Sequence, residues 1–332
     1  MKEIRCLRVR KIWSDDRHNA FTSICGFKGN IYIAFRSAEN HLSHDAAIRI
    51  ICSNDGGTTW KSCAYIQQEN CDLRDPRIIE FNGALHLFTF ANRQNGKSSS
   101  LHITSCDGVN FSDPEEVQGM SWAWGIAEFN GKLYCADYYS PEKPKFFPRL
   151  FSSDDAKTWN KLLDFPFTGN ETAIDFDDDG SLFAFIRDSV PGCIPRYFKL
   201  TSPYDKMPEG DGIFPIRIVG AMIKRLNNAT LLIGRCWDGE SAQAERRNRR
   251  TDVYLIEDGK APQFCFTLPS GGDTSYASYY EVSKTRALIS YYSSHEHLMA
   301  YPIEEKADKI AAMNTHADIY LAEFSHNCTK EQ

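Results

Sequence analysis

A repeated strand unit limits the possible folds of this chain more than any other feature of its sequence. Each copy is a turn residue, glycine in four of the six copies, followed by a short run of apolar and aromatic residues. The copies lie at 29–35, 83–89, 131–137, 180–186, 229–235 and 286–292. Because their starts are 48 to 57 residues apart, six similar units almost fill the 332 residues. Repeats of about this period are typical of propellers and other arrays.

A second apolar strand is expected just before each copy, at 21–27, 77–81, 125–129, 172–176, 219–226 and 277–282. Two short strands joined by a tight turn form a β-hairpin, and four short strands in 40–50 residues make one propeller blade. The sequence therefore predicts an all-β fold, a single six-bladed β-propeller over residues 1–332. We expect a strand at 5–13 to complete the last blade together with 317–324, which removes an open sheet edge.

The composition excludes several classes of function. The formal net charge of −6 offers no electrostatic footprint for nucleic acid, and no apolar run is long enough to span a membrane. Residues 1–13 are basic and lack the apolar segment of a secretory signal peptide. The 11 Cys form no Cys/His cluster with ligand spacing, so neither a metal nor another cofactor is expected. These features predict a cytoplasmic location with reduced thiols, although a non-classical route of secretion is not excluded.

A second marker recurs in three of the units. Residues 53–60 read Ser-Asn-Asp-Gly-Gly-Thr-Thr-Trp, and residues 152–159 repeat the pattern with Ser152, Asp154, and Ala156 in place of glycine. Residues 105–111 look like a shortened copy. Ser and Asp side chains can bond the backbone of a turn, and glycine permits a positive φ. The marker therefore indicates a structural turn rather than a functional site.

This marker resembles the Asp box of the sialidase (neuraminidase) superfamily. The chain resembles more closely the bacterial sialidase-like proteins with Asp-box (BNR) repeats that are often labelled exo-α-sialidase. The second resemblance rests on His-Asn-Ala-Phe at 18–21, Ala-Phe-Arg at 34–36, Asp-Leu-Arg-Asp-Pro at 72–76, and the motifs at 268–276 and 290–296. It covers about residues 15–300 and implies a glycoside hydrolase whose partner is a glycan or small sugar.

The resemblance also implies three catalytic residues. Asp45 lies where the acid/base loop of the family falls, and His41 and His44 in the same loop could share proton transfer. Tyr276 matches the nucleophile of the family, and Glu171 matches the carboxylate that activates it.

The resemblance further implies a set of arginines that bind the substrate. The family holds a sugar carboxylate with three Arg, because the fork of N–H donors matches a carboxylate. Asn19 replaces the first of these, so the clamp is incomplete and a sugar other than a nonulosonic acid is predicted. Arg187 and Arg235 match the second and third, and the other predicted binding residues are Arg36, Arg74, Asp75 and Trp124, the last as a stacking platform.

The starts of the innermost strands are expected to meet at the axis of the propeller. Polar groups that converge there predict a binding site, because buried polar groups need partners. The positions expected at the axis are Asn19, Arg74, Asp75, Trp124, Glu171, Gly220 and Tyr276.

Two other functions remain open from the sequence. A carbohydrate-binding propeller would keep the groups that orient the sugar without catalysing a reaction. A protein-interaction propeller would expose an apolar patch on one face. Catalysis requires Glu171 within hydrogen-bond reach of Tyr276, with Asp45 across a pocket.

Overall fold

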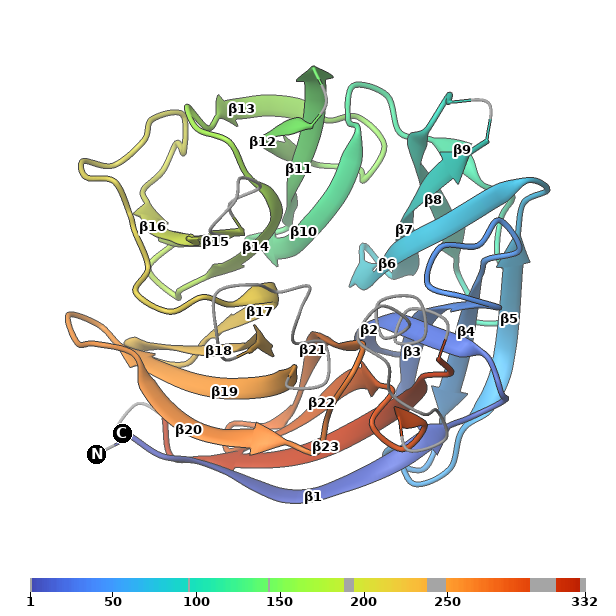
Figure 1. Ribbon diagram of the computed structural model, residues 1–332. Coiled ribbons are helices and arrows are strands. Elements are labelled where there is room, and N and C mark those ends of the chain that lie inside the picture. The colour runs from blue at the N-terminus through green and yellow to red at the C-terminus, as the bar shows by residue number, and fades with distance from the viewer. Residues whose placement is uncertain are drawn as a thin grey trace.

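The computed structural model describes residues 2–94, 96–142, 144–187, 194–237, 249–298 and 315–328. Within these residues the strands form six antiparallel sheets, five with four strands and one with three. Figure 1 shows the sheets arranged around a central axis as the blades of a propeller. The predicted all-β, six-bladed propeller is therefore confirmed. No helix in the described ranges has the length and hydropathy that a membrane span needs.

The blades follow one another along the chain, each with its innermost strand first. The first blade contains β2 (His18–Phe27), β3 (Asn30–Ala38), β4 (Ala47–Ser53) and β5 (Lys61–Gln67). The second contains β6 (Cys71–Phe81), β7 (Ala84–Arg93), β8 (Ser99–Ser105) and β9 (Glu115–Glu116). The third contains β10 (Trp122–Phe129), β11 (Lys132–Glu142), β12 (Lys145–Ser153) and β13 (Asn160–Asp164).

The remaining blades continue around the ring. The fourth contains β14 (Asn170–Phe176), β15 (Leu182–Arg187) and β16 (Arg196–Leu200), and the fifth contains β17 (Val219–Arg225), β18 (Ala229–Cys236), β19 (Arg250–Glu257) and β20 (Gln263–Leu268). The sixth has β21 (Thr274–Ser283), β22 (Arg286–Ser293) and β23 (Asp318–His326), with β1 (Ile4–Trp13) outermost. β1 pairs antiparallel with β23 from Ile4 opposite His326 to Trp13 opposite Ile319. Strands from both ends of the chain thus share one sheet.

Tight two-residue turns join the first two strands of four blades. Both turn residues have positive φ, which defines the type I′ turn that suits the twist of a hairpin. Glycine and asparagine tolerate this conformation better than other residues, which explains the turn residues that mark the repeat. The pairs are Lys28 and Gly29 (48° and 80°), Asn82 and Gly83 (49° and 76°), Asn130 and Gly131 (50° and 72°), and Asn227 and Asn228 (42° and 55°).

The innermost strand of every blade is interrupted by a β-bulge at the same level. The register shifts lie between residues 20 and 23, 74 and 77, 123 and 125, 170 and 173, 219 and 222, and 275 and 278. A bulge turns side chains away from the regular alternation of a strand, so one residue per blade lies at the axis. We call these six residues the axial layer: Phe21, Asp75, Trp124, Glu171, Gly220 and Tyr276.

Four non-glycine residues of the axial layer have left-handed backbone, with φ of 61° at Phe21, 50° at Asp75, 37° at Glu171 and 49° at Tyr276. Such conformations are strained for residues with a Cβ and cluster at functional sites. Here the strain recurs at one level of the ring. The bulges therefore build the centre of the propeller rather than being local irregularities.

The turn at 153–159 differs by one residue from the expected pattern. The sequence predicted the turn bonds at Ser152 and Asp154. Instead, Ser153 donates a hydrogen bond of 3.0 Å to Asp155, whose carboxylate accepts two backbone N–H groups of the turn at 2.7 and 2.8 Å. Ala156 has φ of 64°, so alanine occupies the left-handed position here. The predicted register was wrong because adjacent serines and aspartates fit the spacing equally well.

Candidate active site

Tyr276 and Glu171 form a buried hydrogen-bonded pair in the axial layer. Tyr276 Oη donates to Glu171 Oε1 at 2.9 Å. Arg187 also donates to Oε1, and the Gly220 backbone N–H donates to Oε2 at 3.2 Å. Burial and the adjacent Glu171 carboxylate raise the pKa of Tyr276, whereas Arg235 acts to lower it. The phenol therefore rests in its neutral form, with its proton directed at a carboxylate that can accept it.

Aromatic rings hold the Tyr276 side chain in one orientation. The ring centroids of Phe21, Trp124 and Tyr292 lie 4.8, 5.4 and 6.0 Å from that of Tyr276. Trp124 is 2% exposed, and the guanidinium of Arg77 lies 4.4 Å from its ring centroid. Trp124 was predicted to stack on a sugar ring, but in the structure it packs against Tyr276 and Arg77.

Asp75 is a second buried carboxyl group of the axial layer. Trp122 donates its indole N–H to Asp75 at 3.1 Å. Burial raises the pKa of Asp75 to about 6, against the lowering effect of Arg74 and Arg77, and the Glu171 charge adds to the rise. A carboxyl group whose pKa burial raises toward neutrality is typical of the general acid of a glycosidase. Asp75 is thus suited to carry a proton near neutral pH.

Arg36 and Arg74 share one carboxylate. Arg36 Nε and Arg74 Nη1 each lie 2.8 Å from an oxygen of Asp72. Arg36 has no exposed surface, whereas Arg74 is 7% exposed. Arg74 also donates to the backbone carbonyl of His41 at 2.9 Å, which ties the loop between β3 and β4 to the second blade.

Arg187 and Arg235 likewise lie beside carboxylates of the protein. Arg187 pairs with Glu171, and Arg235 Nη1 pairs with Asp273 at 2.9 Å. The structure thus brings the four predicted binding arginines to three carboxylates near the axis. A carboxylate on a ligand must therefore share the N–H donors of these arginines with the protein carboxylates, or displace those carboxylates. The net positive charge of the site is also smaller than that of three unpaired arginines.

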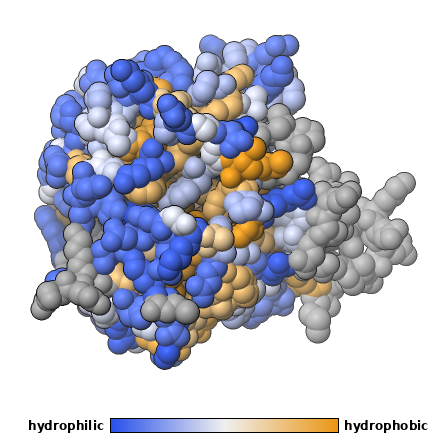
Figure 2. Space-filling model, turned by 90° about the vertical axis from the view of Figure 1, so that its left-hand side faces the viewer, coloured by the Kyte–Doolittle hydropathy of each residue, from blue (hydrophilic) through white to orange (hydrophobic). Residues whose placement is uncertain are grey.

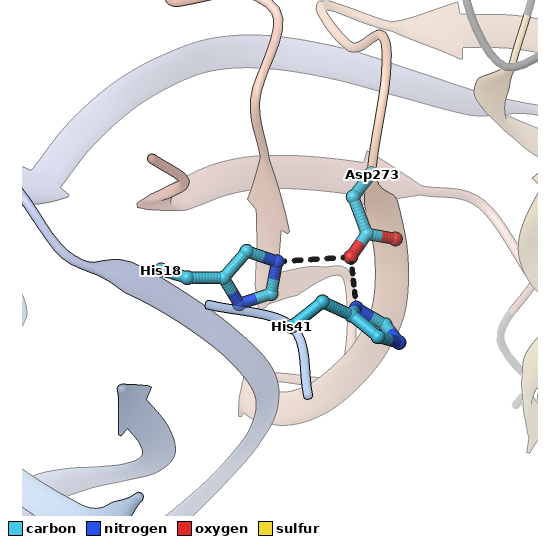
Figure 3. Close-up of side chains that lie close together, drawn as sticks. All are labelled: His18, His41 and Asp273. Atoms are coloured by element: carbon cyan, nitrogen blue, oxygen red, sulfur yellow. Dashed lines mark hydrogen bonds and ion pairs between the residues drawn. The ribbon is translucent and has the colours of Figure 1, made fainter. Parts of the chain in front are cut away.

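Asp273, which comes just before β21, is the hub of the site. Its Oδ2 accepts from His18 Nε2 at 3.0 Å and His41 Nδ1 at 2.5 Å (Figure 3). Its Oδ1 accepts from Arg235 Nη1 and the Tyr292 hydroxyl, both at 2.9 Å. Four donors therefore satisfy this buried carboxylate. Burial acts to raise the pKa of Asp273, but its histidine partners outweigh it and hold the pKa well below the usual range.

Burial lowers the pKa of both histidines, that of His41 to about 4, although Asp273 acts to raise both values. Both imidazoles are therefore neutral at pH 7. Sequence reasoning assigned no role to His18 or Asp273. Both lie within the motifs at 18–21 and 268–276 that carried the family resemblance. The sequence thus marked these two residues but gave no chemical reason to assign them a role.

The Asp45 carboxylate is bound by Arg17 and by groups of its own loop. It accepts hydrogen bonds from Arg17 at 2.5 Å, from the backbone N–H of Glu39 at 3.2 Å and from the Ser43 hydroxyl. Partial burial acts to raise the pKa of Asp45, but these bonds outweigh it and lower the pKa. A strengthened acid already bound by three donors is poorly suited to donate a proton. From this loop, His41 rather than Asp45 contacts the site.

Asn19 does not reach the axis. Its side-chain amide donates to Asp15 at 2.7 Å, and its backbone N–H pairs with the carbonyl of Ala317. The bulge between Ala20 and Ser23 makes Phe21 the axial residue of the first blade. The prediction was wrong because a bulge cannot be read from strand alternation.

A cavity of about 470 Å³ occupies the channel on the other side of the axial layer. All six innermost strands line it, mostly with residues that follow their bulges, such as Arg77, Asp175 and Lys224, and Trp124 of the axial layer also borders it. Glu171 and Tyr276 are not among its lining residues. The Tyr276–Glu171 pair, which belongs to the axial layer, therefore does not border this cavity.

Comparisons with known proteins identify the fold more than the function. No protein-family model and no curated protein sequence matches the chain. A protein of unknown function from Dyadobacter fermentans superposes with a TM-score of 0.73 at 16% identity, covering 97% of this chain and 99% of that one. Trypanosoma rangeli sialidase superposes with a TM-score of 0.66 at 10% identity, covering 92% of this chain and 55% of that one.

The Hadza microbial sialidase Hz136 has a TM-score of 0.64 at 14% identity, covering 82% of this chain and 63% of that one. The chain has a sialidase-like propeller fold. It spans about half the length of the T. rangeli enzyme. At such low identity the likeness establishes the fold, whereas the chemistry has to be argued from the residues of the site.

Proposed function

We propose that this protein is a glycoside hydrolase of the sialidase-like type that removes a terminal sugar from a glycan. The hydrogen bond of 2.9 Å from Tyr276 Oη to Glu171 carries the proposal, because a tyrosine nucleophile needs an adjacent base. The left-handed backbone at both residues supports it further. Arg235, with its guanidinium 5.6 Å from the Tyr276 ring centroid, favours negative charge on the attacking phenol oxygen.

The reaction proceeds in two displacements. Tyr276 Oη attacks the anomeric carbon, and its proton passes to Glu171 while Asp75 protonates the departing glycosidic oxygen. A water molecule then attacks the anomeric carbon and gives one proton to Asp75. The tyrosyl–sugar bond breaks, and Tyr276 regains its own proton from Glu171. Two inversions at one carbon retain the anomeric configuration. We assign the acid/base role to Asp75 rather than Asp45 because Asp75 belongs to the axial layer together with Tyr276, whereas Arg17, Glu39 and Ser43 bind the Asp45 carboxylate. A pKa near 6 also suits Asp75 to proton transfer at neutral pH.

The arginines favour a polar or acidic sugar. Arg74, Arg187 and Arg235 would orient it by sharing their N–H donors between the sugar and their carboxylate partners, while Arg36, which has no exposed surface, would hold Asp72 beside Arg74. Because Arg74, Arg187 and Arg235 already pair with carboxylates, they would hold an acidic group less tightly than three unpaired arginines. This supports the earlier expectation of a sugar other than a nonulosonic acid.

A non-catalytic carbohydrate-binding propeller is the second candidate, favoured by the same arginine–carboxylate pairs. An interaction propeller has less support. Large apolar side chains that are well exposed in the described ranges, such as Leu42, Val109, Phe264 and Val282, lie on different blades. The face in Figure 2 also interleaves hydrophilic and hydrophobic residues.

The test is a screen of aryl-glycosides and natural oligosaccharides with acidic and neutral sugars, using the full chain and Tyr276→Phe, Glu171→Gln and Asp75→Asn. We expect Tyr276→Phe to lose turnover, and Asp75→Asn to lose about 10²- to 10⁴-fold in rate. The exposed Tyr65 provides the control Tyr65→Phe, which should leave the rate unchanged. A fluorinated sugar with a good leaving group should trap a covalent adduct on the peptide that contains Tyr276.

Two outcomes reject the proposal. If the wild type cleaves a sugar and Tyr276→Phe keeps full activity, the nucleophile is wrong. If no sugar is cleaved but glycans bind with an affinity that Arg187→Ala abolishes, the protein is a carbohydrate-binding module.

A further inference from the structure

Three metal-ligating side chains from distant parts of the chain converge beside the axial layer. His18 opens β2, His41 lies in the loop after β3, and Asp273 precedes β21. His18 Nε2, His41 Nδ1 and one Asp273 carboxylate oxygen all lie within 4.8 Å of one another. Figure 3 shows both rings directed at Asp273. In the part of the chain that the structure describes, no other group of three His, Cys, Asp or Glu side chains converges in this way.

The surroundings hold these side chains in place. Asp273 Oδ1 is engaged by Tyr292 and Arg235, so Oδ2 is the oxygen that faces the imidazoles. His18 has no exposed surface, and its ring meets that of His41 edge-on at a centroid distance of 5.3 Å. Hydrogen bonds to the outer oxygen of a ligating carboxylate are typical of metal sites, because they orient the ligand.

We propose that His18 Nε2, His41 Nδ1 and Asp273 Oδ2 bind a divalent transition metal ion of the Zn²⁺ class. Two imidazoles and one carboxylate are a ligand set of catalytic zinc sites, which keep a further position open. Calcium and magnesium prefer oxygen ligands alone. The inference concerns a binding site and does not depend on the hydrolase proposed above.

To accept an ion, the imidazole nitrogens must move apart from Asp273 Oδ2. Zinc lies about 2.0–2.2 Å from nitrogen and oxygen ligands, which places the donor atoms of a tetrahedral site roughly 3.3–3.6 Å apart. The separations to Oδ2 are 3.0 Å for His18 Nε2 and 2.5 Å for His41 Nδ1. His41 can move outward, because it belongs to a loop and its side chain is 19% exposed, against 0% for His18 and 5% for Asp273.

The proton balance permits binding without oxidation or net loss of a proton. Each neutral imidazole that donates to Oδ2 moves its proton to its other ring nitrogen when the metal takes its place. For His41 this nitrogen is Nε2. For His18 it is Nδ1, which is buried and has no partner among the described residues, so the shift leaves a buried N–H without an acceptor, a cost that metal binding must outweigh.

The charge of the surroundings indicates what completes the coordination. Arg235 shares the Asp273 carboxylate, and Arg36 and Arg74 pair with Asp72, while the Asp75 carboxylate also acts on both. A dication added here needs an anion nearby. The open position is therefore suited to hydroxide or to a carboxylate oxygen of a ligand.

Titration of the chelator-treated full chain with Zn²⁺, followed by calorimetry, and with Co²⁺, followed by visible absorption, tests the site. We expect one equivalent to bind, with nitrogen-ligated cobalt bands, and no comparable binding of Ca²⁺ or Mg²⁺. His41→Ala should reduce zinc affinity by more than the 10- to 100-fold that loss of an orienting partner costs. His44→Ala is the matched control, since this exposed histidine lies in the same loop and should leave binding unchanged.

Two further variants separate this site from the proposed function. Tyr292→Phe removes one donor to Asp273 Oδ1 and should reduce zinc affinity by about 10- to 100-fold. Tyr276→Phe should keep full zinc affinity while losing hydrolysis. The proposal is wrong if the wild type binds no zinc. It is equally wrong if His41→Ala binds zinc as tightly as the wild type, because the ion then sits on other groups, such as the exposed thiol of Cys106.

Discussion

Replacing Gly220 with alanine probes how tightly the axial layer is packed. Gly220 has φ of 57°, and an added Cβ would lie 2.8 Å from Cε2 and 3.0 Å from Cδ2 of Tyr276. The ring cannot move aside easily, because Phe21 and Trp124 pack against it and Glu171 binds its hydroxyl. The substitution should therefore destabilise the fold and also displace Tyr276 from Glu171.

The expected loss has two parts. A residue with a Cβ in the left-handed region costs about 1–2 kcal/mol, and overpacking a close-packed interior adds about 1–3 kcal/mol. Gly220→Ala should thus lower the free energy of unfolding by about 2–5 kcal/mol. Gly131→Ala should lower it by only the first part, because Gly131 has φ of 72° and nothing lies within 4 Å of its added Cβ.

Urea denaturation of both variants, followed by far-UV circular dichroism, measures the difference. A double-mutant cycle with Tyr276→Ala isolates the contact, because removal of the ring should leave Gly220→Ala with only its backbone cost. We expect a coupling energy of about 1–3 kcal/mol. Equal losses for Gly220→Ala and Gly131→Ala, or no coupling with Tyr276→Ala, would refute this account of the packing.

Two further predictions concern stability. Arg225 lies 3.8 Å from the Phe183 ring centroid and pairs with Asp177 and Asp258. Arg225→Ala should therefore lower the free energy of unfolding, measured by urea denaturation, by about 3–5 kcal/mol, because these carboxylates lose their cation. A loss as small as that of Lys199→Ala, an exposed neighbour of the same ring, would contradict this. Asp75 has a folded pKa of about 6, above its unfolded value of about 4, so the stability it contributes below pH 4 should fall by about 2–3 kcal/mol as the pH rises from 4 to 6. Asp75→Asn should remove this component of the pH dependence, and parallel stability curves for variant and wild type would contradict the assigned pKa.

Part of the site could be predicted because the repeat carries positional information. Five of the six residues in the axial layer were among the positions expected at the axis, since each precedes an apolar strand at the same point of its unit. Asn19 and Arg74 were also expected there, but the bulge in the first blade brings Phe21 to the axis, and in the second blade Asp75 belongs to the axial layer rather than its neighbour Arg74. The hydrogen bond between Tyr276 and Glu171 joins residues 105 positions apart in the sequence. The family resemblance indicated this pair, and the closed ring of blades brings the two side chains together.

Other features could not be read from local sequence. Asp45 has the right position in its loop, yet Arg17 and Ser43 occupy its carboxylate. Asp273 gathers two histidines that lie 255 and 232 residues away, so no motif spacing reveals the cluster. The pKa of Asp75 depends on burial and on charges from other blades.

The six-fold repeat, its hairpin turns and hence the propeller could be predicted from the amino-acid sequence, because alternation, turn residues and repeat length are local properties. The tertiary structure alone decided which side chains face one another at the axis. Closing six blades into a ring sets the level of each bulge and joins residues hundreds of positions apart. The partners, burial and protonation of each group follow from that closure, because they depend on distances through space rather than along the chain.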